Sequence, residues 1–502
     1  MRNGKLKQAS ITLPLCMALV LSAALILGLV EGARFYGFNQ DAQEAANLTL
    51  ESLFAGYQKT LFEESRMFFL DGSFEGDTWD ISAAEDKMTH LLYENLVASE
   101  NGRGVSFFRM DAAEAQTTGY MLATDGDGDV FFAQVAKMMK KCMGKQAVEK
   151  ILQSIQSVEK KQKEAPDLKT SMQDAKSAIK EASKENTQNF GEDKGNVKDG
   201  GADDKSPQKP ESKENPLATV QKLRKNGILA LTLPSKMSVS EKSIPVNGTL
   251  MKRKLKKGTY QNIKNPGWQE RILAQEFVKP LAGCAVSPNE SGSLSYGMEY
   301  IICGNGSDEK NLKKTVNKLL LMREAFNFLY LQTDQKKQAE AMAAATAISG
   351  VIANPAIVPV VKQGILAAWA YVESICDVKA MLSGGKVPLM KDASHWKSSL
   401  EHLGEAVFSE QKGDGAGLTY ENYLDVLLYA KTKKQMAYRS MDLLEWRMQK
   451  EKGYESCKMD QMIAGMKIEA VFDARTLFFG IFAQDRVGGY RFLKKAEYVY
   501  GQ

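Results

Sequence analysis

An uncharged apolar run near the N-terminus constrains this chain more than any other feature of its sequence. Ile11 to Val30 forms 20 residues without a charge, and at about 1.5 Å per residue such a helix spans roughly 30 Å, the thickness of a bilayer hydrocarbon core. Arg2, Lys5 and Lys7 precede it. The positive-inside tendency therefore predicts a cytoplasmic N-terminus at 1–10, a transmembrane helix at 11–30 and an extracellular bulk.

Two other roles for this run stay open, a cleaved export signal and the core-forming stem of a pilus-like assembly. Export signals have apolar regions of about 7–15 residues followed by a small-residue cleavage site. Here the run is longer, and the best candidate site, "VEGAR", has Glu31 three residues before the cut. Cys16 lies near the start of the run, not at its end where lipidation would be expected. The pattern favours an uncleaved anchor.

The composition is that of a large globular body and excludes nucleic acid as an expected partner. The chain has 502 residues, 44% hydrophobic and 25% charged, with a net charge of +5, and it has room for two or three domains. Its lysines are spread among acids and form no basic segment, as nucleic-acid binding would require.

Six cysteines are few and widely spaced, and no CxxC pair occurs, which argues against a zinc knuckle or a thioredoxin-type site. Cys284 and Cys303 are close enough in sequence to pair outside the cell, and buried free thiols are the equal alternative. The six are Cys16, Cys142, Cys284, Cys303, Cys376 and Cys457.

Beyond the anchor, helical spacing of apolar residues predicts that the helix continues as a stem until "DGSFEGDTWD" breaks it. The stem and a first extracellular segment cover 31–184, including a polar helix or helical hairpin at 146–185. Residues 185–216 are too polar to offset their ordering entropy, which predicts a flexible linker. The apolar stem positions are Ala42, Ala45, Ala46, Leu50, Leu53, Phe54, Tyr57, Leu61 and Phe62.

The C-terminal body, 217–502, is predicted to be helical and to end in β-strands, so the fold class is mainly α with a minor β part (α+β). A short helix precedes a β-like run at 228–233, and a strong amphipathic helix covers 311–333. Alternating β-formers in "MKIEAVFDARTLFFGIF" and "GGYRFLKKAEYVYGQ" predict a closing β-pair.

A second uncharged stretch, 341–361, is also long enough to cross a bilayer. It contains Asn354 and two prolines, and the charged residues Glu373, Asp377 and Lys379 follow it. These features favour a buried helical hairpin that turns at Asn354-Pro355, and a membrane hairpin is the open alternative.

Two motifs resemble ligand-binding loops without completing them. "TDGDGDVFFAQVAK" alternates Asp125, Asp127 and Asp129, but an EF-hand needs glycine and glutamate where this chain has Val130 and Ala136. It is interpreted as a polar turn before a helix, with a weak incidental cation site as the alternative.

"AMLSGGKVPL" has Ala380 and Val387 where a phosphate loop needs glycine and a hydroxyl. Gly384 and Gly385 are therefore interpreted as a helix stop.

Histidine is nearly absent, with only His90, His395 and His402. His395 and His402 would lie two turns, about 10 Å, apart on a helix, too far to share one metal. No GxSxG, HExxH or SxxK occurs. We therefore predict no enzyme activity, no catalytic, cofactor-binding or metal-binding residues and no cofactor, although 61 acids leave carboxylate pairs open.

Several stretches resemble a family of exported, membrane-anchored proteins with a domain of unknown function, found in Gram-positive anaerobes and often near tight-adherence (Tad) pilus genes. They include "ASITLPLCMALVLSAALILGLVEGARFYG", "LFEESRMFFLDG", "NPLATVQKLRKNGILALTLPSK", "EYIICGNGSDEKNLKKTVNKLLLMREAFNFLYLQTD", "ILAAWAYVESICDVKAMLSGGKVPL" and "GLTYENYLDVLLY". The resemblance implies a TadE/TadG-like minor pseudopilin or pilus-assembly accessory.

The chain departs from prepilins, because the usual glutamate five residues into the apolar stem is absent and no clear peptidase glycine precedes Ser10. Processing and polymerisation like a major pilin are therefore not expected. The expected function is a single-pass, membrane-anchored structural or assembly protein, with membrane lipid and other pilus or envelope proteins as partners. The alternative is a surface-displayed module for cell-wall polymer or carbohydrate, suggested by Trp268, Trp369, Trp396 and Trp446.

Overall fold

The computed structural model describes residues 12–74, 79–100, 110–163, 168–189, 215–260, 267–352, 354–411, 413, 415–477 and 489–500. Backbone contacts gather the chain into two compact units. The sheet unit comprises Met1–Met138, Lys254–Pro266 and Arg447–Gln502, and the helical unit comprises Met139–Arg253 and Gly267–Trp446. The predicted linker lies almost wholly outside the described residues, and the predicted domain boundaries stay predictions.

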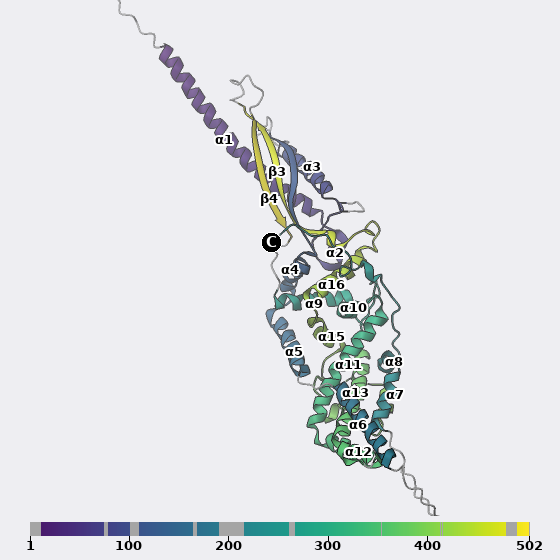
Figure 1. Ribbon diagram of the computed structural model, residues 1–502. Coiled ribbons are helices and arrows are strands. Elements are labelled where there is room, and N and C mark those ends of the chain that lie inside the picture. The colour runs from purple at the N-terminus through teal and green to yellow at the C-terminus, as the bar shows by residue number, and fades with distance from the viewer. Residues whose placement is uncertain are drawn as a thin grey trace, which may run out of the picture. The chain divides into compact units, whose positions relative to one another are not determined.

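The first element is a single long helix, α1 (Thr12–Ala55), which begins in the apolar run and continues beyond it (Figure 1). The predicted extension of the helix beyond the apolar run is confirmed, but the stem is shorter than expected. It stops before Gly56, and α2 (Lys59–Ser65) starts anew where the Gln58 side chain accepts a hydrogen bond from the Leu61 N–H. An extended cap residue interrupts the helical backbone there, although the apolar spacing continues.

The strands form one antiparallel sheet, in which β3 is central. β2 pairs along one edge of β3, and β1 and β4 pair along the other. The predicted C-terminal β-pair is confirmed as β3 and β4. β2 comes from a stretch that the sequence left unassigned. The strands are β1 (Leu70–Asp71), β2 (Met110–Leu122), β3 (Met462–Arg475) and β4 (Gly489–Val499).

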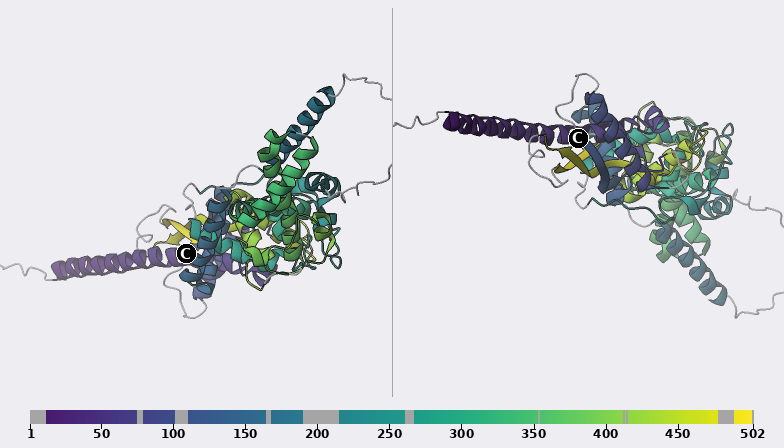
Figure 2. Two further views of the ribbon diagram at one scale, coloured as in Figure 1. Left: turned by 90° about the horizontal axis from the view of Figure 1, so that it is seen from below. Right: turned by 90° about the horizontal axis from the view of Figure 1, so that it is seen from above.

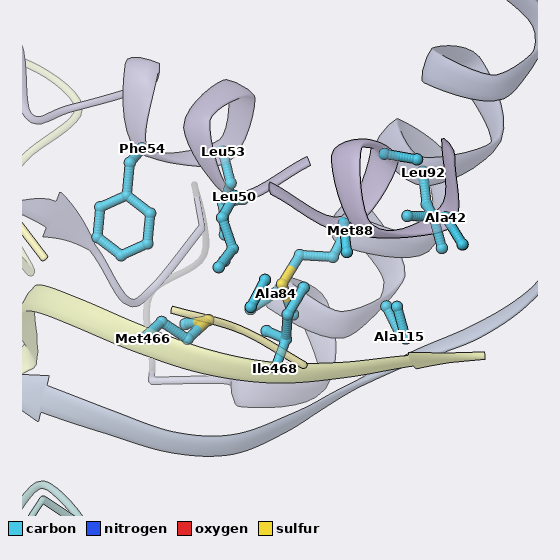
Figure 3. Packing of buried hydrophobic residues seen from close by; sticks show 14 of the residues in the cluster. Ala42, Leu50, Leu53, Phe54, Ala84, Met88, Leu92, Ala115, Met466 and Ile468 are labelled. Carbon is cyan, nitrogen blue, oxygen red and sulfur yellow. The ribbon is translucent and has the colours of Figure 1, made fainter. Parts of the chain in front are cut away.

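The two faces of this sheet differ in chemistry. α1 and α3 (Ile81–Glu100) cover one face, and their apolar side chains interleave with those of β2 and β3 (Figure 3). On the other face, opposite charges stand across β3 and β4 as ion pairs: Lys467–Glu497, Glu469–Lys495 and Asp473–Arg491. Period-two alternation thus buries one face of the sheet and solvates the other.

Three helices follow β2: α4 (Asp125–Cys142), α5 (Lys145–Lys163) and α6 (Leu168–Asn189). The polar helical region predicted at 146–185 is confirmed as the helices α5 and α6, but α6 is more than a solvated helix. It packs on α13 (Val358–Leu382), where Gly364 has no side chain to keep the Ala175 methyl away.

The β-like run at 228–233 was wrongly predicted, since Ile228–Thr232 forms the short helix α8 after α7 (Pro216–Lys225). The Thr232 hydroxyl donates to the Ile228 carbonyl within this turn. β-branched residues favour a strand only where another strand is available to pair with, and in the described chain none pairs with this segment.

In the helical unit, α13 packs against α6, α7 and α8 and against three of the helices given below, α11, α12 and α14. The predicted amphipathic helix is confirmed as α11, and the predicted hairpin turns at Asn354, whose side chain caps the next turn. α13 is apolar and long enough to cross a membrane, yet 56% of its apolar stretch is buried inside the protein, as in a core helix. The remaining elements are α9 (Trp268–Ala282), α10 (Gly297–Cys303), α11 (Asp308–Thr333), α12 (Gln335–Ile352), α14 (Leu403–Phe408), α15 (Tyr420–Tyr429), α16 (Lys433–Met448), η1 (Val246–Gly248), η2 (Pro355–Ile357), η3 (Ala393–His395) and η4 (Met459–Gln461). The fold is thus mainly α with a minor β part, as predicted.

Candidate functional site

The N-terminal half of α1 is apolar and uncovered, which makes it the first candidate functional surface. None of its most apolar stretch is buried, and its large side chains are open all round the helix, with Leu21 71% exposed. In the part of the chain that the structure describes, no other element packs along this half (Figure 1 and Figure 2). A helix that is apolar on every side is stable only in lipid or inside a larger assembly.

A buried ion pair marks the end of the uncovered half. The Arg34 guanidinium donates to the Glu31 carboxylate at 2.8 Å, and both side chains are almost fully buried. Arg34 also donates to the Arg475 carbonyl, and Glu31 accepts from the Leu477 N–H. The pair therefore joins α1 to the end of β3.

The second half of α1 belongs to the protein core. Phe38, Ala42 and Leu50 are almost completely buried against the sheet and α3. Phe54 contacts the rings of Tyr498 and Tyr500 at 4.7 and 5.0 Å. One continuous helix is thus both an uncovered apolar segment and a core element.

The helical unit contains a buried network of four charged side chains in contact with one another, here called the four-charge network. Arg323 and Lys391 face Asp377 and Glu373, and all four side chains have no solvent exposure. Arg323 lies 3.0 Å from Asp377, and Lys391 lies 2.5 Å from the other oxygen of Asp377. Burial alone would raise the pKa of Asp377, but the charges of Lys391 and Arg323 outweigh burial and hold this pKa below its ordinary value.

Neutral groups add hydrogen bonds to the same network. Arg323 also donates to the Pro388 and Leu389 carbonyls, and Glu373 accepts from Ser398. A network with two charges of each sign and many hydrogen bonds is typical of a structural centre, because its groups hold one another in place.

A second buried carboxylate has a pKa close to neutrality. Burial raises the pKa of Glu299 to about 7, against hydrogen bonds from the Ala285 N–H and the Tyr420 hydroxyl. Cys284 lies nearby, and burial raises the pKa of its thiol to about 12. A thiol with so high a pKa is not an activated nucleophile.

A third buried carboxylate, Asp442, is also protonated more readily than usual. Burial raises its pKa to about 7, while the Tyr300 hydroxyl and the Leu250 N–H donate to it. Its neighbour Glu445 pairs with Arg253. Asp442 thereby holds the backbone at Leu250, a position that the sequence analysis did not single out.

The Asp125 loop is a turn that leads into a helix, as predicted. Gly126, Asp127 and Gly128 adopt left-handed backbone angles before the regular part of α4. Asp125 accepts hydrogen bonds from the N–H groups of Leu122 and Gly258, so each of its carboxylate oxygens binds a backbone N–H group. Among the described residues, no group of three or more His, Cys, Asp or Glu side chains is arranged to hold a metal ion.

The other singled-out residues lie apart from one another. α13 ends at Leu382 and Gly384 has a φ of 81°, which confirms the helix stop. Cys284 and Cys303 are free thiols. The histidines do not gather, since His90 faces Glu94, His395 faces Asp392 and His402 faces Glu405.

Three of the four tryptophans that the sequence analysis singled out pack against other protein groups. Trp369 is buried and donates to Ser398, and its ring contacts that of Trp396 at 5.8 Å. The Lys337 ammonium lies over both rings, at 4.7 and 5.0 Å. Trp446 is half-buried against Tyr300, and the side chain of Trp268 lies outside the described part.

Sequence reasoning missed the partners in the four-charge network. Glu373 and Asp377 were noticed as charges in an apolar stretch, which was the available signal, since buried acids need cations. Arg323 and Lys391 carried no local signal, because they lie on separate segments that only folding brings together.

Comparison with known protein families gives a match. Residues 206–474, more than half of the chain, match the profile described as "Family of unknown function (DUF5702)". No curated protein and no solved structure matches the chain. The matched region includes most of the helical unit and β3 but not α1. The chain belongs to this family of unknown function.

Proposed function

We propose that this protein is a membrane-anchored extracytoplasmic structural or assembly protein, accessory to a Tad-type pilus or secretion system of a Gram-positive anaerobe. α1 carries the anchor, with its N-terminus in the cytoplasm and the folded units outside. The observation behind this proposal is that one unbroken helix is uncovered and apolar in its first half and is a core element in its second half.

The Glu31–Arg34 ion pair, which lies between the uncovered half and the core half of α1, supports a permanent anchor. Cleavage in "VEGAR" would remove Glu31 and leave Arg34 at the new N-terminus, with its buried guanidinium deprived of the carboxylate that it contacts. Leaving one member of a buried pair without its partner is strongly destabilising. An intact N-terminus is therefore the stable arrangement.

The assembly role is supported by the resemblance to Tad-associated proteins and by the chemistry of the described residues. The buried network of Arg323, Lys391, Asp377 and Glu373 holds its groups in place and gives the helical unit a rigid interior, which suits a body that makes contacts with other proteins. The expected partners are membrane lipid along residues 11–30 and other pilus or envelope proteins along the folded units.

The first experiment determines the mature N-terminus and the cell fraction of the native protein. An intact start in the membrane fraction supports the anchor. A start at or near Ser10 would indicate prepilin-type processing and a place within the pilus, and a start after Val30 would contradict the anchor. Deletion of the gene tests the assembly role separately, because unchanged surface pili and adhesion would contradict that role and leave the anchor standing.

The alternative of a binding module for cell-wall polymer or carbohydrate gains nothing from the structure. Its support was the tryptophans, and Trp369, Trp396 and Trp446 all pack against other protein groups. Binding to purified cell wall would nevertheless favour it over the assembly role.

A further inference from the structure

The end of the sheet where β3 stops and β4 begins lies level with the end of the α1 apolar run. Glu31 follows the run directly and accepts from the Leu477 N–H at 3.4 Å, and Arg34 donates to the Arg475 carbonyl at 3.4 Å. Across from them, the Phe35 ring contacts the Tyr490 ring at 5.2 Å. The last residues of β3 and the first of β4 are therefore held beside the first helical turn after the run.

This level corresponds to the lipid headgroups. Glu31 to Phe35 lie about 1.5 to 7.5 Å beyond Val30 at 1.5 Å per residue. Each headgroup layer is roughly 5–7.5 Å thick, from a hydrocarbon core of about 30 Å within a bilayer of about 40–45 Å. With the run at 11–30 in the bilayer, Arg475, Leu477 and Tyr490 reach the outer headgroup layer.

Side chains at this level suit the interface between lipid and water. The Tyr36 backbone lies about 9 Å beyond Val30, but its side chain tilts back toward the helix N-terminus and is 69% exposed. Leu477 is 48% exposed, and Phe35 and Leu477 both present apolar surface near the exposed Arg475. Aromatic rings and basic side chains are enriched at membrane interfaces, where apolar parts insert and polar tips meet headgroups. Further along the sheet the outward face carries the paired charges of β3 and β4 instead.

We propose that Phe35, Tyr36, Arg475, Leu477 and Tyr490, here called the collar, form a second membrane contact that binds phospholipid of the outer leaflet. Arg475 meets the phosphate groups, while Leu477 and Phe35 enter the upper acyl region. The inference rests on the proposed anchor, because the bilayer that holds α1 is the one that the collar touches.

The collar fixes the orientation of the sheet unit relative to the membrane. A single helix by itself leaves its body free to tilt and to turn about the helix axis. Because the Glu31–Arg34 pair ties β3 to α1, contact at Leu477 restricts both movements. A subunit held in this way presents the same outward faces to its neighbours.

Site-specific lipid crosslinking tests the collar in the full-length protein. A benzophenone amino acid replaces Leu21, Leu477 or Leu493 in turn, in vesicles of phosphatidylglycerol and phosphatidylcholine whose acyl chains carry an alkyne. Leu21 lies within the apolar run and reports the anchor. Leu493 is the matched control, because it is 56% exposed on the outward face of β4 and lies roughly 10 Å further from the membrane than Tyr490 at about 3.4 Å per strand residue.

We expect lipid adducts from positions 21 and 477, with position 477 giving several-fold more adduct than position 493. Adducts at 21 with equally few at 477 and 493 would overturn the collar and leave the anchor intact. Absence of adducts at 21 would contradict the anchor itself. A protein–protein adduct at 477 without lipid would overturn the collar as a lipid contact and point to a second copy of the chain.

Discussion

Replacing Arg323 with methionine should destabilise the helical unit strongly. Arg323 is completely buried and neutralises one of two acids in the network, so its loss leaves a net negative charge inside the protein. It also leaves the Pro388 and Leu389 carbonyls without the hydrogen bonds that it donates. Methionine occupies similar space, so a cavity adds little, and removal of one partner of a buried pair costs about 3–5 kcal/mol.

Urea unfolding followed by tryptophan fluorescence measures this loss, because Trp369 and Trp396 lie in the same unit as Arg323. The matched control is Lys313→Met, an exposed cation on the same helix. Surface substitutions of this kind change stability by about 0.5 kcal/mol or less. Both variants are studied in detergent micelles with α1 intact.

A second variant separates charge balance from packing. Arg323→Met combined with Asp377→Leu restores equal charges, since Lys391 and Glu373 remain paired. The double variant should therefore recover part of the stability lost in Arg323→Met alone. A loss below about 1 kcal/mol for Arg323→Met, as for an exposed ion pair, would refute the assignment of this network as a stabilising centre.

Three further predictions concern carboxylates outside this network. Burial raises the pKa of Glu299 from 4.5 to about 7. Between these two pH values the folded protein keeps the Glu299 proton, whereas the unfolded chain has lost it. The stabilising contribution of this proton, about 3 kcal/mol, therefore disappears as the pH rises from 4.5 to about 7. Glu299→Gln should remove this part of the pH dependence in urea unfolding at pH 5 and pH 8, and an unchanged difference between the two pH values would contradict it. Arg34→Met should destabilise the sheet unit by about 3 kcal/mol, because the buried Glu31 carboxylate loses its cation. Adding Glu31→Gln should restore part of this stability, and limited proteolysis measures both effects. Asp125→Ala should cost about 1–3 kcal/mol by leaving two backbone N–H groups without an acceptor, whereas calcium should leave the wild-type Tm unchanged, and a rise in Tm with calcium would restore the cation-site alternative.

Local patterns were sufficient wherever neighbours in sequence are also neighbours in space. The apolar run predicted the first half of α1, the helical spacing predicted α11, and alternation predicted the β3 and β4 pair. Asn354 before a proline predicted the turn of the helical hairpin. These signals come from backbone geometry and short-range hydrogen bonding, which depend on a few adjacent residues.

Other features needed partners far along the chain. β2 pairs with β3 across more than 300 residues, and its own sequence did not separate it from its surroundings. The run at 228–233 satisfied the composition of a strand but became helical, because pairing decides whether such a run forms a strand.

The amino-acid sequence by itself determined that this protein has an apolar N-terminal helix, a mainly helical body and a β-pair near its C-terminus. Only the tertiary structure decided that α1 also serves as a core helix of the sheet unit and that Arg323 neutralises Asp377, 54 residues away. The physical reason is that a hydrophobic pattern is formed by residues close together in sequence. A buried charge requires a partner of opposite charge, which any segment of the chain can supply.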